Sequence, residues 1–295
     1  MTTNGSNLPL HATLVDSDMP GRKLSGMDEE ANPQNGNAIE RDGSSSSRVL
    51  SILDLFTVEA AEWSIEEIAS ALRLTRTTAY RYTKTLIDAG LLASINTGTY
   101  VLGPRLIELD RQIRLADPML RAALPIMAAI RREVDGMQQL CSYYGDRVMC
   151  VHHDATEPGI DATVDRGRPF PLFVGASRVI LANLPTRQLQ RFMLNHAAEI
   201  ARVGLGENWQ QFSKAMRRIR QAGYYAAVGE LDSDNFGVSA PIMHSKGITG
   251  CLRIARPLTR YDESDLPGMV RLATSAAARI SAAIQARETT PDRST

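Results

Sequence analysis

SIEEIASALRLTRTTAYRYTKTLIDAG, residues 64–90, is the stretch of sequence that decides the fold of the N-terminal part. Ser64 followed by Glu67 is a capping box, so a helix is expected to begin here. Thr75 suits the N-cap of a second helix, and Gly90 suits its C-terminal stop. The expected buried positions are Ile65, Ile68, Ala69 and Leu72 in the first helix and Ala79, Tyr82, Leu86 and Ile87 in the second. Two short helices joined by a tight turn indicate a helix-turn-helix.

The flanking segments extend this motif on both sides. Residues 48–56 carry apolar side chains at the spacing of an amphipathic helix. Residues 91–95 and 99–102 are strand-like and enclose Asn96-Thr97-Gly98, a turn whose Asn and Gly tolerate positive φ. Three helices followed by a hairpin predict a winged helix-turn-helix domain over residues 48–103.

The second helix of the motif holds a local cluster of positive charge. Between Arg73 and Leu86 the chain has four basic residues and no acidic one. On a period of 3.6 residues Arg76, Tyr80 and Lys84 share a face opposite the apolar side, which suits insertion into a major groove. The alternative is that this basic face is merely solvated.

Helix-turn-helix docking assigns different roles along this helix, because its first residues reach base edges and later ones meet phosphates. We expect Arg76 and Thr77, with Tyr80, to read bases, and Arg81 and Lys84 to contact mainly the backbone of double-stranded operator DNA. The hairpin brings no charge to this interface. The predicted DNA-binding set is Thr75, Arg76, Thr77, Thr78, Tyr80, Arg81 and Lys84.

The amino-acid composition excludes several classes of protein but does not identify the function. Lys and Arg number 33, as do Asp and Glu, so no global positive field attracts nucleic acid and only a local cluster can. An apolar content of 43% and a charged content of 22% are typical of a globular chain. No stretch has the apolar length of a membrane span or signal peptide, so a soluble, cytoplasmic protein is expected. Three cysteines without C-x-x-C spacing predict neither disulfides nor structural zinc.

The remaining sequence predicts a linker helix over residues 104–120 and an α+β domain over residues 121–288. Short turns at residues 145–146 and 244–247 favour antiparallel hairpins. Polar residues 1–47 and 289–295 are expected to be a disordered tail and a flexible C-terminus. Helices are expected over residues 120–134, 176–183, 186–197, 208–222 and 264–286, and strands over residues 137–144, 147–153, 224–228, 236–243 and 249–255.

Several motifs together resemble the IclR family of bacterial transcription regulators. They are Arg48-Val49-Leu50, residues 64–72, Thr75 to Arg81, Tyr100-Val101-Leu102-Gly103, residues 167–172, residues 181–185, Ala222-Gly223-Tyr224, Glu230 and residues 237–242. The resemblance covers nearly everything after the tail. It implies a GAF-like or profilin-like effector-binding domain, a dimer or dimer of dimers, and control of genes for catabolism of small organic or aromatic acids.

The resemblance also implies where an effector binds. The matching positions are Gly175, Ala176, Ser177, Gly237, Ser239, Cys251, Arg253 and Ala255. The chain departs from its relatives at Phe173, where they have histidine, and at Arg178, where they have lysine. An inward-pointing Arg253 could hold a carboxylate through two parallel hydrogen bonds, which favours an acidic effector. Strand alternation places Arg253 with Cys251 and Ala255; the alternative is a solvated Arg253 on the outer face.

Other functions fit the sequence less well. Gly175-Ala176-Ser177-Arg178-Val179 lacks the second glycine of a nucleophile elbow, so no catalytic residue is expected. Alternation sends His152 and His153 to opposite faces of a strand, so neither a metal nor another cofactor is expected. Apolar contexts make the cysteines packing residues rather than redox sensors. A DNA-binding architectural protein without effector is the main alternative. Repressor and activator, and dimer and tetramer, remain open.

Overall fold

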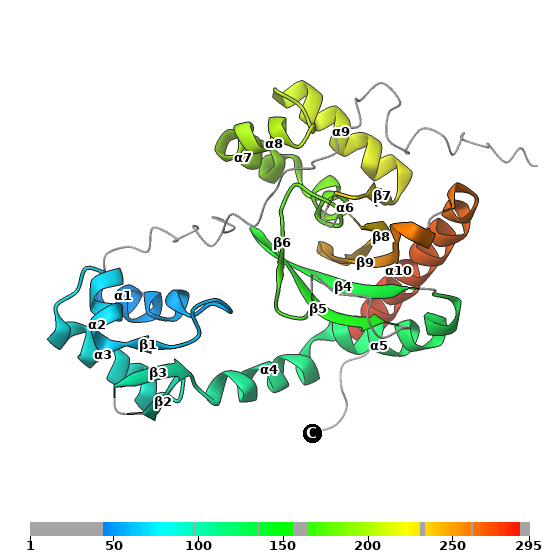
Figure 1. The fold of residues 1–295 in the computed structure, drawn as a ribbon. Coiled ribbons are helices and arrows are strands. Elements are labelled where there is room, and N and C mark those ends of the chain that lie inside the picture. Colours follow the sequence, from blue (N-terminus) through cyan, green and yellow to red (C-terminus); the bar gives the residue numbers. More distant parts are fainter. Residues whose placement is uncertain are drawn as a thin grey trace, which may run out of the picture. The chain divides into compact units, whose positions relative to one another are not determined.

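The computed structural model describes residues 44–96, 98–134, 136–155, 165–230, 234–260 and 262–289. Contacts divide the described chain into two compact units, with the boundary in the sequence between Asp117 and Pro118 (Figure 1). Of the predicted tails, residues 1–43 and 290–295 lie outside the described residues. Residues 45–47, predicted to belong to the tail, are instead helical, and Thr289 still belongs to the last helix.

The N-terminal unit is a helix-turn-helix followed by a hairpin. Its helices are α1 (Ser45–Ser51), η3 (Leu53–Leu55), α2 (Ile65–Ala71), α3 (Arg76–Asp88) and α4 (Arg105–Ala116). Its strands are β1 (Trp63–Ser64), β2 (Leu92–Asn96) and β3 (Thr99–Leu102), ordered β1-β3-β2 and antiparallel. The predicted helix over residues 48–56 was misplaced, because Ser44 caps a helix that ends at Ser51. Strand β1 was missed because its two residues are too few to show a period.

Caps fix where α2 and α3 begin. The Glu67 backbone N–H donates to Ser64 Oγ, and the Ser64 backbone N–H donates to Glu67 Oε2, at 3.2 and 2.7 Å. This is the predicted capping box, which satisfies two helix-end donors at once. The Thr75 hydroxyl accepts from the backbone N–H of Thr78, as predicted for the N-cap of α3.

Two glycines let the hairpin close against the end of α3. Gly90 follows α3 at a φ of 72°, and its carbonyl lies where a Cβ on Gly103 would have to be. The backbone N–H of Gly103 donates to the Leu91 carbonyl at 2.8 Å. Only glycine allows so close an approach of two backbone segments.

The C-terminal unit is built on one six-stranded sheet. The order is β6-β5-β4-β9-β8-β7, and every neighbouring pair is antiparallel, which confirms the predicted α+β class. The strands are β4 (Met137–Tyr144), β5 (Arg147–Ala155), β6 (Pro169–Phe170), β7 (Tyr225–Val228), β8 (Asn235–His244) and β9 (Gly247–Pro257).

Helices cover both faces of this sheet (Figure 1). α5 (Pro118–Ile130) and α10 (Leu266–Thr289) pack on the face of Leu252 and Ile254. The opposite face, with Cys141 and Cys251, is covered by α6 (Ser177–Ala182), α7 (Thr186–Asn195), α8 (Ala197–Arg202) and α9 (Trp209–Ala222). Short η4 (Arg131–Glu133), η5 (Leu258–Arg260) and η6 (Glu263–Asp265) complete the unit. Successive strand residues therefore belong to two separate apolar layers.

Two helix predictions differ from the structure in detail. The helix expected over residues 120–134 begins at Pro118, since proline suits a first helical position, and gives way to η4 after Ile130. The helix expected over residues 186–197 is two helices, because His196 leaves the helical region with a φ of −132°.

None of the helices in the described part of the chain combines the length and the apolar character that a membrane span requires.

Candidate nucleic-acid interface and effector site

Helix α3 presents a buried side and a basic outer side. Ala79, Tyr82 and Leu86 are buried against the other helices of the N-terminal unit, and Thr83 joins them. The outward residues are exposed, with Tyr80 at 55%. Arg76, Thr77, Tyr80, Arg81 and Lys84 thus lie together on the solvent side. This places five of the seven predicted DNA-binding residues on one continuous surface.

The two remaining residues of that set have a structural task. The Thr75 and Thr78 hydroxyls lie 2.8 Å apart and form a hydrogen bond with each other, while Thr75 also caps the helix.

Two arginines of α3 have contacts within the N-terminal unit. Arg81 lies over the Tyr82 ring, with 5.4 Å from the guanidinium carbon to the ring centroid. Arg76 is held differently, because its Nε donates to Glu66 Oε1 of α2 at 2.7 Å.

A second basic feature adjoins the start of α3. A hollow of about 280 Å³ is lined by Arg48, Ser51, Leu72, Arg73 and Leu74. Arg73 adopts a left-handed backbone, with a φ of 52°, in the turn between α2 and α3. Sequence reasoning counted Arg73 only as local charge and gave Arg48 no role. The signal for both was the absence of acidic residues beside them in the sequence.

The predicted effector residues meet on the α6 side of the sheet. In the register of the strands, Tyr225, Ser239, Arg253, Gln139 and His153 stand opposite one another across β7, β8, β9, β4 and β5. Five polar side chains therefore form one row across an otherwise apolar face, which we call the polar row. Sequence reasoning found only Ser239 and Arg253, because the register of the strands was unknown.

Arg253 is the charged centre of the polar row. It is only 4% exposed, so the alternative of a solvated Arg253 is wrong. Its Nη1 donates to Gln139 Oε1 at 2.5 Å. Its guanidinium also fills the space beside Gly237, where an added Cβ would lie 2.7 Å from Arg253 Nε. Gly237 pairs with Ala255, so these small residues leave room for the guanidinium.

The loop before α6 reaches the same face. The Cys251 thiol donates to the Ala176 carbonyl at 3.7 Å, and Ser177 is fully buried. The Gly175 backbone N–H donates to Glu230 Oε2 at 3.1 Å. The eight predicted effector positions thus come from the loop before α6, the first residue of α6 and two neighbouring strands.

Arg178 ties this loop to the sheet. Its guanidinium donates to the Phe173 carbonyl at 2.9 Å, to the Tyr225 hydroxyl at 2.5 Å and to the Val203 carbonyl at 3.0 Å. It also pairs with Glu230 at 3.4 Å. Burial raises the pKa of Tyr225, so this phenol stays protonated. The departure from lysine to arginine supplies a planar fork with several donors.

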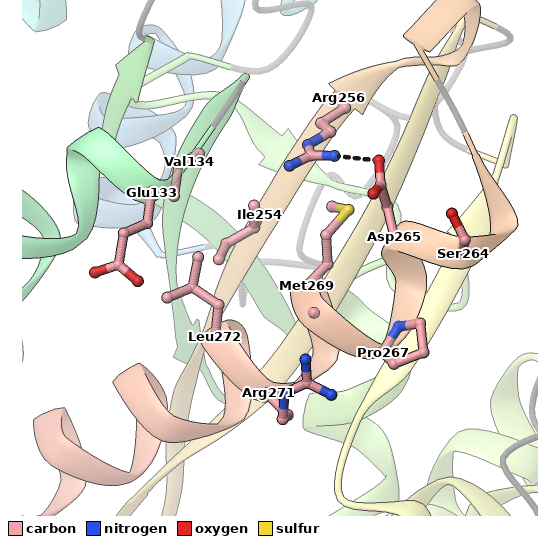
Figure 2. A pocket seen from close by; sticks show the side chains of 11 residues that line it. Glu133, Val134, Ile254, Arg256, Ser264, Asp265, Pro267, Met269, Arg271 and Leu272 are labelled. Atoms are coloured by element: carbon pink, nitrogen blue, oxygen red, sulfur yellow. Dashed lines mark hydrogen bonds and ion pairs between the residues drawn. The ribbon is translucent and has the colours of Figure 1, made fainter.

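A separate hollow lies on the other face of β9 (Figure 2). It has a volume of about 400 Å³ and is lined by side chains from β9, η4, η6 and the start of α10. Arg256 and Asp265 form an ion pair of 2.9 Å in its wall, and Arg271 lies near the rim. None of the predicted effector positions lines this hollow. It is therefore a second place at which a small molecule could be tested.

The three cysteines form a buried row of their own. Cys150, Cys141 and Cys251 are direct neighbours across β5, β4 and β9. Burial raises the pKa of Cys141, and it raises that of Cys150 to about 12. Protonated, buried thiols react poorly with oxidants, which fits packing residues. Within the described residues, no group of three or more metal-ligating side chains is assembled.

Comparison with protein families decides between the functions that this geometry allows. The IclR helix-turn-helix domain matches residues 45–94, and the C-terminal domain described as bacterial transcriptional regulator IclR matches residues 116–282. The chain belongs to the IclR family. An IclR-type regulator has a DNA-binding domain and an effector-binding C-terminal domain. Helix α3 lies in the first match, and the polar row lies in the second.

Individual relatives agree with this assignment. The HTH-type transcriptional regulator KipR of Bacillus subtilis is 25% identical over 236 residues, covering 79% of this chain and 93% of the relative. An IclR homologue from Microbacterium hydrocarbonoxydans, solved with 4-hydroxybenzoate, superposes with a TM-score of 0.67 at 23% identity, covering 82% of this chain and all of that one. A transcriptional regulator from Rhodococcus sp. RHA1 gives 0.66 at 22% identity, covering 81% and 97%. The structural likenesses show the shared fold.

Replacing Arg178 by lysine tests the tie between loop and sheet. One ammonium group cannot reach three acceptors that lie in different directions, so Arg178→Lys should lower stability by about 2 kcal/mol. Calorimetry should show a lower midpoint for the C-terminal unit. Arg187→Lys, at an exposed position of α7, is the matched control and should leave the midpoint unchanged. Equal midpoints for both variants would contradict the assigned contacts.

Proposed function

We propose that the protein is a sequence-specific DNA-binding transcription regulator whose operator binding is modulated by a small carboxylic or aromatic acid. The observation that carries this proposal is the basic, exposed side of α3 within a capped helix-turn-helix. A neutral chain needs such a local patch to bind DNA at all. The second domain, with a buried arginine in a polar row, favours an effector over ligand-independent binding.

The DNA contacts divide by position on α3. Arg76 and Thr77 stand at the first helical positions, where base edges come within reach, and Tyr80 lies one turn further on. Arg81 and Lys84 lie where a docked helix meets phosphates. Thr75 and Thr78 belong to the same proposed set and support it, because the Thr75 hydroxyl accepts from the Thr78 backbone N–H at the helix start and binds the Thr78 hydroxyl. Arg48 and Arg73 add basic groups beside the start of α3.

Base and phosphate contacts respond differently to substitution. We expect Arg76→Ala to weaken binding to the selected operator and to reduce discrimination between bases. Lys84→Ala should instead weaken binding to all sequences and lower the slope of log affinity against log salt by about one unit. Selection of sites from random DNA followed by fluorescence anisotropy at several salt concentrations measures both effects. Wild-type operator affinity in both variants would remove α3 from the interface.

The effector proposal rests on Arg253. A guanidinium binds a carboxylate through two parallel charge-assisted hydrogen bonds, and it is held here by Gln139 above small residues. The structural relative with 4-hydroxybenzoate supports an aromatic acid as one candidate. The proposed lining is Gly175, Ala176, Ser177, Gly237, Ser239, Cys251, Arg253 and Ala255.

Thermal shift with matched probes tests this site. A ligand that binds the folded state raises the melting temperature, so 4-hydroxybenzoate should do so and the uncharged 4-hydroxybenzamide should not. Arg253→Met, which keeps the bulk of the side chain, should abolish the shift while DNA affinity without effector stays near wild type. Arg271→Ala, at the rim of the hollow in Figure 2, is the control and should keep the shift. A shift lost only in Arg271→Ala would move the site to that hollow.

Self-association completes the proposal. Helix α4 has no buried residue within its own unit, and it exposes Ile107 by 74%, Ile113 by 51% and Leu115 by 58%. Apolar side chains exposed along one helix are typical of an interface, and a second copy of this chain is the proposed occupant.

Charge placed on α4 should disturb this association. Ile113→Glu buries a carboxylate in the proposed interface, so we expect the dimer to dissociate at least about tenfold more easily. Sedimentation equilibrium measures the constant, and Gln112→Glu on the same helix is the control for charge alone. Unchanged self-association in Ile113→Glu would exclude α4.

A further inference from the structure

The two acidic residues at the start of α2 have different tasks. Glu67 is engaged in the capping box, since its Oε2 accepts hydrogen bonds from both the backbone N–H and the hydroxyl of Ser64. Glu66 instead reaches across to α3, where its Oε1 accepts from Arg76 Nε at 2.7 Å. The bond to Arg76 lowers the pKa of the Glu66 carboxyl, so it is ionised at neutral pH. The neighbouring carboxylate therefore provides a natural control for Glu66.

The hydrogen bond to Glu66 leaves the two terminal nitrogens of Arg76 available for DNA. A guanidinium has one N–H on Nε and four on its two terminal nitrogens. Glu66 uses the Nε position, and among the described residues Nη1 and Nη2 of Arg76 donate no hydrogen bond. Both side chains are largely exposed, at 79% for Arg76 and 62% for Glu66, so the terminal edge faces solvent. The free pair of donors matches a base with two adjacent acceptors.

Guanine is the base with that pattern. In the major groove it presents O6 and N7 side by side, and a bidentate arginine is their commonest partner. An exposed arginine tied at Nε loses less conformational entropy on binding than a free one, because its direction is already set. The same carboxylate repels phosphates, so it lowers affinity for DNA of any sequence. Glu66 thus lowers the affinity for DNA of any sequence and raises the preference for guanine over other bases.

We propose that Glu66 is a specificity-determining positioning residue, which holds Arg76 by its Nε so that the terminal nitrogens read a guanine in the operator. The inference rests on the proposed DNA-binding function and deepens it by naming the base class. Surface ion pairs contribute little to folding, so Glu66 can be changed without loss of the fold.

Three single variants separate positioning from charge. Glu66→Gln removes the charge and weakens the hold on Arg76. Glu66→Asp keeps the charge but is shorter by one carbon, about 1.5 Å, and cannot span to Nε in this geometry. Glu67→Gln makes the same charge change one residue away and preserves the capping box, in which glutamine also serves. Circular dichroism and melting temperature establish that all three are folded.

The measurement is the ratio of affinities for the selected operator and for operators with the read guanine replaced in turn by each other base. Wild type should prefer guanine by about tenfold or more. Glu66→Gln and Glu66→Asp should both lower that ratio at least threefold, whereas Glu67→Gln should keep it. In an Arg76→Ala background, Glu66→Gln should no longer change the ratio, since the side chain through which it acts is gone.

Two results would overturn the inference. If Glu66→Gln and Glu67→Gln raise affinity for all sequences equally and keep the ratio, Glu66 acts only as a charge. If Glu66→Asp behaves as wild type, reach to Arg76 is unnecessary. Both results leave the proposed function intact. A wild-type protein from which random-DNA selection recovers no preferred site would instead contradict the proposed function itself.

Discussion

Burial of Ala79, Tyr82 and Leu86 in the N-terminal core sets the rotation of α3 about its axis, and the DNA-reading surface depends on that rotation. Successive residues of a helix differ by about 100° in direction, so a fixed apolar side dictates which residues face outward. Arg76, Tyr80 and Lys84 are thereby placed on the side away from the core. The caps at Ser64 and Thr75 then fix where each helix begins, which brings Glu66 of one helix to Arg76 of the next.

The same kind of constraint organises the C-terminal unit through a period of two. Leu252 and Ile254 belong to the layer of α5 and α10, so Arg253 between them must face α6. A buried guanidinium costs solvation free energy unless polar groups surround it, and Gln139 lies beside it. Arg253 is therefore the charged centre of the proposed effector site, whereas Arg256, on the other face of β9, forms an ion pair with Asp265.

The sequence predicted local features well because capping and helical spacing are local. The capping box, the Thr75 cap, the hairpin strands and the outward face of α3 all follow from residues within one turn of each other. Features that depend on pairing over long distances were missed: β1 and β6, the polar row through Gln139 and Tyr225, and the Glu66 contact. Their partners are distant in sequence or lie on another element, and no single-chain periodicity encodes a register.

Protection of guanine N7 from methylation by dimethyl sulfate tests the central claim most directly, since N7 lies in the major groove. The account predicts that the wild-type protein protects a guanine in its selected operator and that this guanine becomes reactive again in the complex with Arg76→Ala. Lys84→Ala, measured at saturating protein, should still protect it. Protection of that guanine that is identical in wild type and Arg76→Ala, or protection that is absent from every guanine, would contradict the reading of a guanine by Arg76 of α3.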